Sequence, residues 1–223
     1  NKPEKCIKET IQITKNNKED IENIENEIKP GQGKGLEIEK EEEVNELEKI
    51  IKNIVYISSY RKAPDRIFIP KQRLQKYVGK NGEYTSEILN NDKSILKKVN
   101  EWLEKIVQYT LSTKKKRGTA DFVNFDDQIA EVKNINILDL GSGIAQVLPI
   151  ITQAFKSRND IILVEEPEIH LHPKAQARIG AMFADAIKEP YNNTFIIETH
   201  SENLLLRLER LIKKGKLSKD DVS

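Results

Sequence analysis

Three absences limit what this chain can be. It has a single cysteine, Cys6, which excludes an internal disulfide and fits a reducing compartment. No apolar run approaches the roughly 20 residues that span a bilayer, and no signal peptide is visible, so we predict a cytoplasmic chain without a membrane partner. The 37 basic and 36 acidic residues nearly cancel, so no global field attracts nucleic acid.

The most informative segment that is present is the apolar run Ile161–Val164, which ends in Glu165, Glu166 and Pro167. An apolar run of this kind predicts a fully buried strand of a parallel sheet, and ligands bind at the carboxyl ends of such strands. Neighbouring side chains on an extended chain point in opposite directions. One carboxylate can therefore hold Mg2+ through its water shell while the other positions an attacking water, as nucleotide hydrolysis requires.

Two flanking segments also place polar groups where strands or turns end. Gly141, Ser142 and Gly143 precede an apolar helical stretch, and a glycine-rich turn at a helix N-terminus can bind anions. Downstream, His200 follows a short apolar strand that begins at Thr194. Ser201 is then placed to cap a helix over Glu202 to Lys213. We therefore expect the acids, the glycine turn and the histidine to line one edge of a sheet.

The order of these motifs resembles ABC-type AAA family ATPases with an overcoming-lysogenization-defect-like or SMC-like head. The motifs that carry the resemblance are Val55–Arg61, Asp139–Pro149, Glu165–Pro173 and Glu198–Ser201. The family implies an α/β fold with a largely parallel sheet flanked by helices. It also implies ATP and Mg2+ as cofactors, and a homodimer that holds nucleotide between two heads.

The resemblance assigns roles residue by residue. Glu165 takes the magnesium-associated acid position of Walker B, Glu166 the catalytic base and His200 the switch histidine. The signature-loop residues, which contact the nucleotide of the opposite subunit, are Gly141, Ser142, Gly143 and Gln146. His170, Leu171 and His172 fall where a loop crosses the dimer interface.

One expected motif is missing. No Gly-x-x-x-x-Gly-Lys-[Ser/Thr] phosphate loop, the Walker A motif, occurs, and Gly31–Gly35 fails on spacing and lacks the hydroxyl. The chain opens at Asn1, and its only methionine is Met182. We therefore expect a C-terminal lobe fragment that carries the signature, Walker B and histidine motifs and is inactive alone.

The domain prediction divides the chain after residue 53. Residues 1–53 are charge-rich and read as a helical insertion or arm, and residues 54–223 as the C-terminal part of the ATPase head. Periodicity predicts a patchy helix from Ile7 to Ile28 and helices over Glu39–Asn53, Leu89–Ile106 and Pro173–Lys188, with strands at Ile54–Ile57 and Gln128–Asn134.

Several single features keep two interpretations. Arg61 or Arg66 could approach phosphate or a partner subunit, or could form a surface ion pair. Lys114–Arg117 fits a charged loop tip better than a nucleic-acid contact. His170 and His172 share a face of an extended chain, as metal ligands do, but no convincing third ligand accompanies them.

Two functional classes follow. The first is a bacterial ATP-hydrolysing head that drives a coupled activity, such as DNA maintenance or phage defence. The alternative is a head that dimerises on nucleotide without hydrolysis, or a scaffold for a separate nuclease or DNA-binding partner. A methyltransferase-like reading of Asp139–Gly143 is weaker, because no acid ends a following strand in the expected frame.

Overall fold

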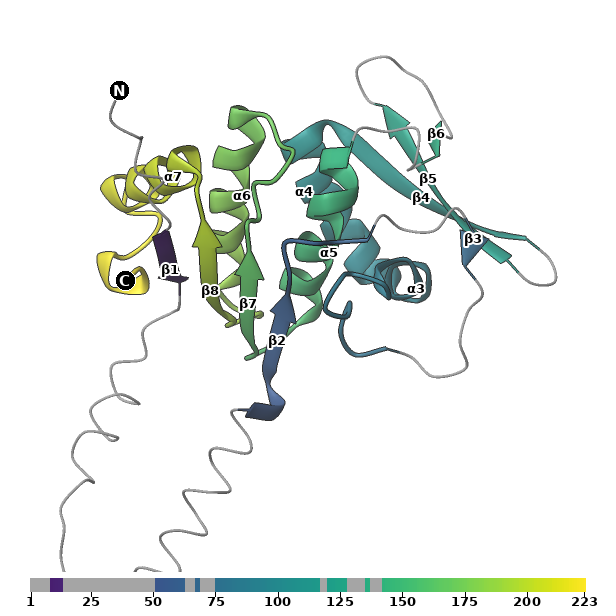
Figure 1. The fold of residues 1–223 in the computed structure, drawn as a ribbon, viewed down its shortest axis with the longest axis horizontal. Coiled ribbons are helices and arrows are strands. Elements are labelled where there is room, and N and C mark those ends of the chain that lie inside the picture. The colour runs from purple at the N-terminus through teal and green to yellow at the C-terminus, as the bar shows by residue number, and fades with distance from the viewer. Residues whose placement is uncertain are drawn as a thin grey trace, which may run out of the picture.

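In a computed structural model, the described part of the chain forms two sheets and a layer of helices (Figure 1). The structure describes residues 9–13, 51–62, 67–68, 75–116, 120–127, 135–136 and 142–223. In these residues a four-stranded sheet has the order β1-β8-β7-β2, and a second sheet has the order β3-β5-β4 with β6 paired to β5.

The first sheet is mostly parallel. Strands β2 (Ile54–Ile57), β7 (Ile161–Glu165) and β8 (Thr194–Thr199) run in one direction, and β1 (Glu9–Ile13) runs antiparallel along β8. The three parallel strands with flanking helices confirm the predicted α/β fold class. They also bring three strand ends, distant in sequence, to one edge.

Strand β7 was expected to be buried on both sides, but it is buried on one. Ile162 and Val164 are almost fully buried, whereas Ile161 and Leu163 are half-buried. Alternating side chains of a strand point to opposite faces, so the apolar run alone could not show that only one face is covered.

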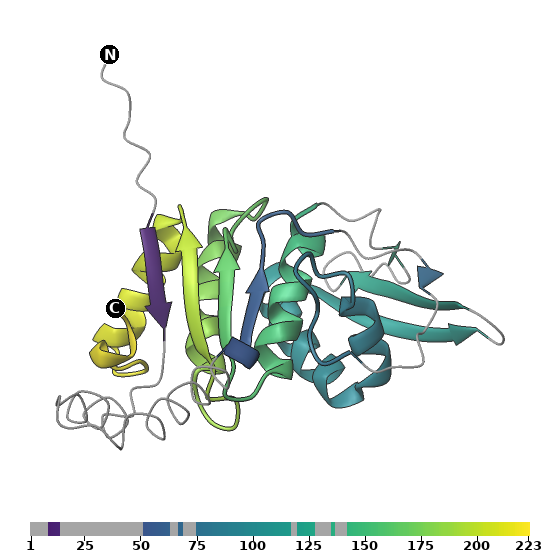
Figure 2. The same ribbon diagram turned by 60° about the horizontal axis from the view of Figure 1, so that its bottom comes forward.

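Helices α5 (Ser142–Lys156), α6 (Pro173–Ala186) and α7 (Glu202–Lys213) lie behind the strands on one face of this sheet (Figures 1 and 2). Each starts near its predicted residue. Pro173 occupies the first turn of α6, where the missing N–H costs nothing. Ser201 Oγ accepts a hydrogen bond from the Leu204 N–H at 3.2 Å and caps α7, as predicted.

The core forms between this helical layer and the sheet. The largest fully buried side chains include Phe155, Phe183 and Phe195, and the rings of Phe183 and Phe195 lie 4.8 Å apart. Trp102 is buried against Phe155, with ring centroids 6.2 Å apart, in agreement with a core role. None of the helices in the described residues is long and apolar enough to cross a membrane.

The helix expected over Leu89–Ile106 is two helices, α3 (Thr85–Asn91) and α4 (Lys93–Val107). Asp92 separates them, because its backbone is extended and its carboxylate accepts a hydrogen bond from the Ile95 N–H at 3.1 Å. An aspartate at this position caps the next helix more favourably than it continues the previous one.

The second sheet was not predicted. It comprises β3 (Ile67–Phe68), β4 (Tyr109–Lys116), β5 (Ala120–Asp127) and β6 (Ile135–Asn136). Lys114 to Lys116 therefore belong to a strand and not to a loop tip. Asn100 of α4 joins this sheet to the helices, since its side chain bonds both the N–H and the carbonyl of Leu111, at 2.8 and 2.9 Å.

The structure tests only some of the predictions made for the N-terminal residues. The helix expected from Ile7 to Ile28 is wrong at Glu9–Ile13, which is strand β1, because the exposed edge of β8 offers backbone partners that outweigh a weak helical stripe. The rest of that stripe, residues 39–50 and residues 128–134 lie outside the described residues. The division after residue 53 stays a prediction. A short 3-10 helix over Lys219–Asp221 ends the described chain.

Candidate functional site

The candidate site lies at the carboxyl edge of the parallel strands. Strand β7 ends at Glu165 and is paired with β8 so that Glu165 lies opposite Glu198. Glu166 and His200 then follow the two neighbouring strands at the same edge. The structure thus brings together three polar residues that the sequence placed at strand ends.

Glu165 faces the neighbouring strand β2. Its Oε1 accepts a hydrogen bond from the Tyr56 hydroxyl at 2.6 Å, and its Oε2 accepts one from the Ser59 N–H at 3.0 Å. The hydrogen bond to the carboxylate raises the pKa of Tyr56, and burial and the charges of Glu165 and Glu198 act in the same direction. Both carboxylate oxygens are therefore held in place before any ligand binds.

Glu166 takes a backbone conformation that residues with a Cβ seldom adopt. Its φ is 42°, in the left-handed region, and its N–H donates to the Glu198 carbonyl at 2.8 Å. Because of this turn, the side chain of Glu166 leaves the backbone in a different direction from that of Glu165. Positive φ values at non-glycine residues cluster at functional sites, so the observation supports a functional role for this turn.

Glu168 connects the loop after β7 to the end of β8. It is 8% exposed, and its Oε1 accepts a hydrogen bond from the His200 N–H at 2.6 Å. Its Oε2 is buried and has no hydrogen-bond partner. The sequence analysis gave Glu168 no role of its own, although its position within the acidic motif Glu165–Pro173 was an available signal.

Arg61 is buried beneath this edge, and its guanidinium contacts backbone carbonyls. It is 2% exposed, its Nη1 donates to the carbonyls of Ser58 and Glu165 at 2.8 Å each, and its Nη2 donates to the Glu166 carbonyl at 2.9 Å. Burial lowers the pKa of Arg61 to about 10, against the opposing charges of Glu166, Glu168 and Glu165. The guanidinium is therefore neither part of a surface ion pair nor open to phosphate.

Gln146, expected at the nucleotide, is turned toward Arg61. Its Nε2 donates to the Arg61 carbonyl at 2.9 Å, and its Oε1 is buried without a partner. Its assignment to nucleotide stays a prediction, but the described contact ties α5 to the segment after β2.

The N-terminus of α5 touches the loop after β7. A Cβ placed on Gly143 would lie 2.6 Å from the His170 carbonyl oxygen and 2.9 Å from a methyl of Leu171. Only a glycine permits this approach without movement of the loop. Ser142 is the first residue of α5, whereas Gly141 lies outside the described residues.

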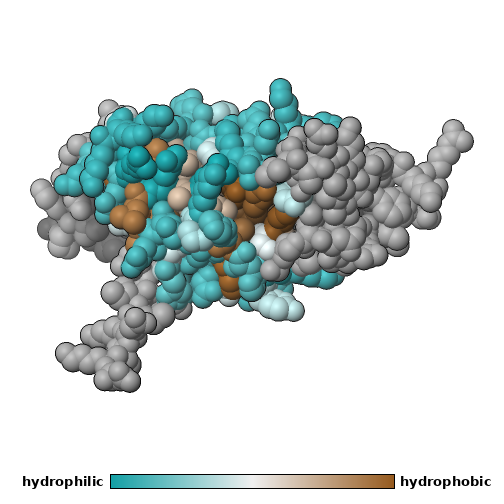
Figure 3. All heavy atoms as spheres, turned by 90° about the horizontal axis from the view of Figure 1, so that it is seen from above, coloured by the Kyte–Doolittle hydropathy of each residue, from teal (hydrophilic) through white to brown (hydrophobic). Residues whose placement is uncertain are grey.

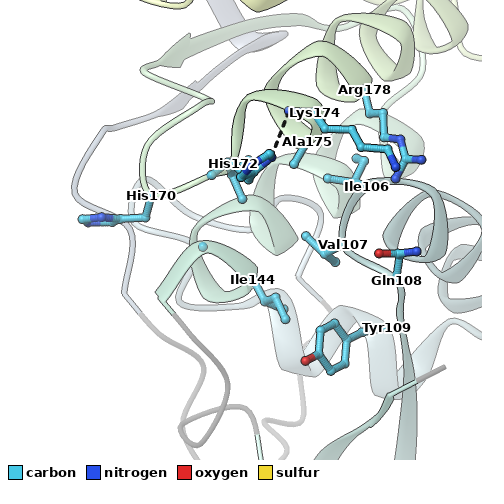
Figure 4. A pocket seen from close by; sticks show the side chains of 12 residues that line it. Ile106, Val107, Gln108, Tyr109, Ile144, His170, His172, Lys174, Ala175 and Arg178 are labelled. Atoms are coloured by element: carbon cyan, nitrogen blue, oxygen red, sulfur yellow. Dashed lines mark hydrogen bonds between the residues drawn. The ribbon is translucent and has the colours of Figure 1, made fainter. Parts of the chain in front are cut away.

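A cavity of about 430 Å3 opens beside this contact, between α4, β4, α5 and α6 (Figure 4). Its floor is apolar and includes Ile106, Ile144 and Ala175. Lys174 and Arg178 lie side by side along its rim, and none of its described lining residues is acidic. The view from above also shows hydrophobic residues gathered amid a hydrophilic surface (Figure 3). The cavity therefore suits an anionic group attached to an apolar one.

The loop histidines have different surroundings. His172 caps α6, since its Nδ1 accepts a hydrogen bond from the Lys174 N–H at 3.3 Å. His170 is exposed and points away from the cavity (Figure 4). The part of the chain that the structure describes contains no group of three or more potential metal ligands.

The residues at this edge fit a magnesium ion that keeps most of its water ligands. Mg2+ commonly binds through one or two carboxylates together with substrate phosphates, so a dedicated cluster is not required. Glu165 supplies carboxylate oxygens, which are ligands of the right chemistry, at the strand edge.

Comparison with protein families finds a match to the AAA ATPase domain over residues 1–205 of the 223. A search of curated proteins gives no match. The family match covers both the strand edge with its acids and the histidine strand, and it agrees with the parallel α/β architecture. This chain belongs to the family of AAA ATPase domains, which bind and hydrolyse ATP.

Proposed function

We propose that this chain forms part of a head that hydrolyses ATP held between two copies of the protein. The observation that carries the proposal is the shared edge of β7 and β8, where Glu166 and His200 follow adjacent parallel strands. Ligands of open α/β sheets bind outside the carboxyl ends of the strands. The family match supplies the identity of the ligand class, a nucleoside triphosphate.

The two adjacent acids divide the chemistry between them. Glu165 is fixed toward β2 and is suited to hold a metal through water. Glu166, whose own backbone is left-handed, orients the attacking water and accepts its proton. His200 binds the terminal phosphate by a hydrogen bond as negative charge redistributes there. When bound, Mg2+ neutralises charge on the phosphate oxygens.

The second copy of the chain contributes the surface around the N-terminus of α5. We assign Gly141, Ser142 and Gly143 to the nucleotide of the opposite head, because a helix N-terminus favours anions. The cavity beside Gly143 supports this assignment, since Lys174 and Arg178 add positive charge without a lining carboxylate. The phosphate loop with its lysine is assigned to residues outside these 223.

The resemblance also points to a coupled process. We place the protein in the bacterial cytoplasm and propose that hydrolysis drives a nuclease or DNA partner, in DNA maintenance or phage defence. The resemblance to overcoming-lysogenization-defect-like heads motivates this proposal.

The test replaces Glu166 by glutamine in the full-length protein. We expect phosphate release to fall roughly 100-fold to 10,000-fold, because a general base contributes about that much, while ATP still binds. Glu209→Gln on the exposed face of α7 is the matched control and should leave hydrolysis unchanged. Unchanged hydrolysis in Glu166→Gln would show that the base is misassigned.

One observation favours the non-hydrolysing alternative. Both oxygens of Glu165 already accept hydrogen bonds within the chain, which suits a structural carboxylate as well as a metal-associated one. The two functions differ in one measurement on the wild-type protein. A head that dimerises on ATP without releasing phosphate uses nucleotide as an assembly signal, whereas turnover together with dimerisation identifies the hydrolase.

A further inference from the structure

Arg61 makes an unusual set of contacts at the candidate site. Its guanidinium donates to the carbonyls of two consecutive residues, Glu165 and Glu166, at 2.8 and 2.9 Å, and to the Ser58 carbonyl at 2.8 Å. Consecutive carbonyls of an extended strand point in opposite directions. One guanidinium reaches both only because the chain turns at Glu166, where φ is 42°.

The contacts therefore stabilise the turn and not merely the strand. A left-handed backbone is disfavoured for a residue with a Cβ, so it persists only where the surroundings hold it. The planar fork of an arginine matches two neighbouring acceptors, whereas a lysine ammonium is a point donor on a flexible stem. Burying a guanidinium among carbonyls is costly, as the lowered pKa of Arg61 shows.

Arg61 is also hydrogen-bonded to α5, through its backbone carbonyl. Gln146, one turn into that helix, donates to the Arg61 carbonyl at 2.9 Å. On the other side of the loop, Gly143 of α5 lies against the His170 carbonyl. The N-terminal part of α5 is therefore joined to the loop after β7 at two points, through Arg61 and through the contact of Gly143 with His170.

We infer that Arg61 is a positioning residue, which fixes the turn at Glu166 and links the orientation of this carboxylate to the N-terminus of α5. The inference rests on the proposed role of Glu166 in hydrolysis. Contact of a second head with the α5 N-terminus would then set the base in place, so that hydrolysis follows dimer closure.

The test compares Arg61→Lys with Arg158→Lys in the full-length protein. Arg158 is a matched control, because it also donates to two backbone carbonyls, those of Phe155 and Ser157, at the opposite end of α5. We expect Arg61→Lys to lower kcat about 100-fold with KM for ATP within about threefold of wild type, since a displaced catalytic group costs roughly that factor. Arg158→Lys should change neither.

A second readout does not depend on hydrolysis. The amides of Ile169 and Leu171 donate to the carbonyls of Glu166 and Glu168 within the loop. Their hydrogen exchange should be at least about tenfold faster in Arg61→Lys than in Arg158→Lys. If wild-type protein releases no phosphate, the proposed function fails, yet faster exchange at these amides still supports Arg61 as the residue that holds the turn.

Two outcomes would overturn the inference. One is a kcat for Arg61→Lys equal to that of Arg158→Lys, and the other is unchanged exchange at both loop amides. If Arg61→Lys does not fold, Gln146→Ala removes only the link to α5 and should lower kcat about tenfold with KM unchanged. An unchanged kcat in a folded Gln146→Ala would then exclude the coupling.

Discussion

The two ends of the parallel sheet both bury polar side chains, but they use them differently. At the amino end, Asn193 donates to the Ala154 carbonyl at 2.9 Å and accepts from the Asp160 N–H at 3.3 Å. Gln153 likewise accepts from the Val78 N–H at 2.8 Å and donates to Ser157 Oγ at 2.6 Å. Each amide therefore uses both its donor and its acceptor.

The carboxyl end leaves polar capacity unused. Arg61 Nε, Gln146 Oε1 and Glu168 Oε2 are buried without a hydrogen-bond partner among the described residues, as Asn192 Oδ1 is at the amino end. Left-handed backbones also occur at both ends, at Glu166 and His170 here and at Asn159 and Asn192 there. A buried polar atom without a partner costs stability. The difference lies in the residue type, because asparagine adopts a left-handed backbone more readily than glutamate. The strained residue Glu166 therefore belongs to the carboxyl end, where ligands of such sheets bind.

We expect the largest loss of stability from a substitution at the amino end of the sheet. Asn193→Ala leaves the Ala154 carbonyl and the Asp160 N–H without partners, and each such group costs roughly 1–3 kcal/mol. We expect the free energy of unfolding to fall by about 3 kcal/mol in urea denaturation followed by circular dichroism. ATP hydrolysis per folded molecule should not change. A loss of activity at unchanged stability would reverse the roles of the two ends.

Intermediate losses of stability and of hydrolysis are expected at Gly143, where the carboxyl end is tightly packed. The Cβ of Gly143→Ala would meet the His170 carbonyl at 2.6 Å, so we expect about 2 kcal/mol of destabilisation and about tenfold slower hydrolysis as the loop moves. Phosphate release and thermal unfolding measure both quantities.

Gly180→Ala is the matched control for that experiment. It is also a helical glycine near a carbonyl, that of Leu204, but the distance is 3.1 Å and the contact lies between α6 and α7. The better helix propensity of alanine offsets the tight contact, so stability should stay within about 1 kcal/mol and hydrolysis should be unchanged. Equal losses of hydrolysis in both variants would argue against a specific role for the Gly143 contact.

The smallest effect is expected at Asp92, between α3 and α4. The Ile95 N–H and the Lys156 ammonium, at 3.1 Å each, lower the pKa of Asp92 although burial opposes them. Its stabilising effect is therefore present above the ordinary pKa of 3.8 and is lost as pH falls from there through the folded pKa. Asp92→Ala should cost about 1 kcal/mol at pH 7, as loss of a helix cap does.

Asp92→Asn separates the two contributions. Asparagine caps a helix about as well as aspartate but does not titrate. We expect most of the stability at pH 7 to remain and the dependence on acid pH to weaken in denaturation measured from pH 7 to pH 2.5. Full retention of the pH dependence would mean that another group causes it.

The sequence predicted those parts of the fold in which a local pattern and a boundary residue agree. Strands β2, β7 and β8 coincide with apolar runs that end in polar residues. The bounds of α7 and its cap, Ser201, were both predicted. The break at Asp92 could have been found too, since aspartate before a helical run is a capping signal. These features depend on neighbours within a few residues.

The remaining features depend on distant partners. Strand β1 exists because β8 offers an edge, and strands β4 and β5 pair over a polar segment without a clear apolar alternation. The contacts of Arg61 could not be predicted, because no local pattern shows that its guanidinium reaches carbonyls 104 and 105 residues further along the chain.

The sequence alone determined which residues this protein carries to the ends of its strands: Glu165 and Glu166 after β7, and His200 after β8. The tertiary structure decided that these ends meet at one edge, that Glu165 is held by Tyr56, and that Arg61 fixes the turn at Glu166. The reason is physical, because strand periodicity and caps are set by adjacent residues, whereas parallel pairing and the burial of a charge depend on contacts between segments far apart in the chain.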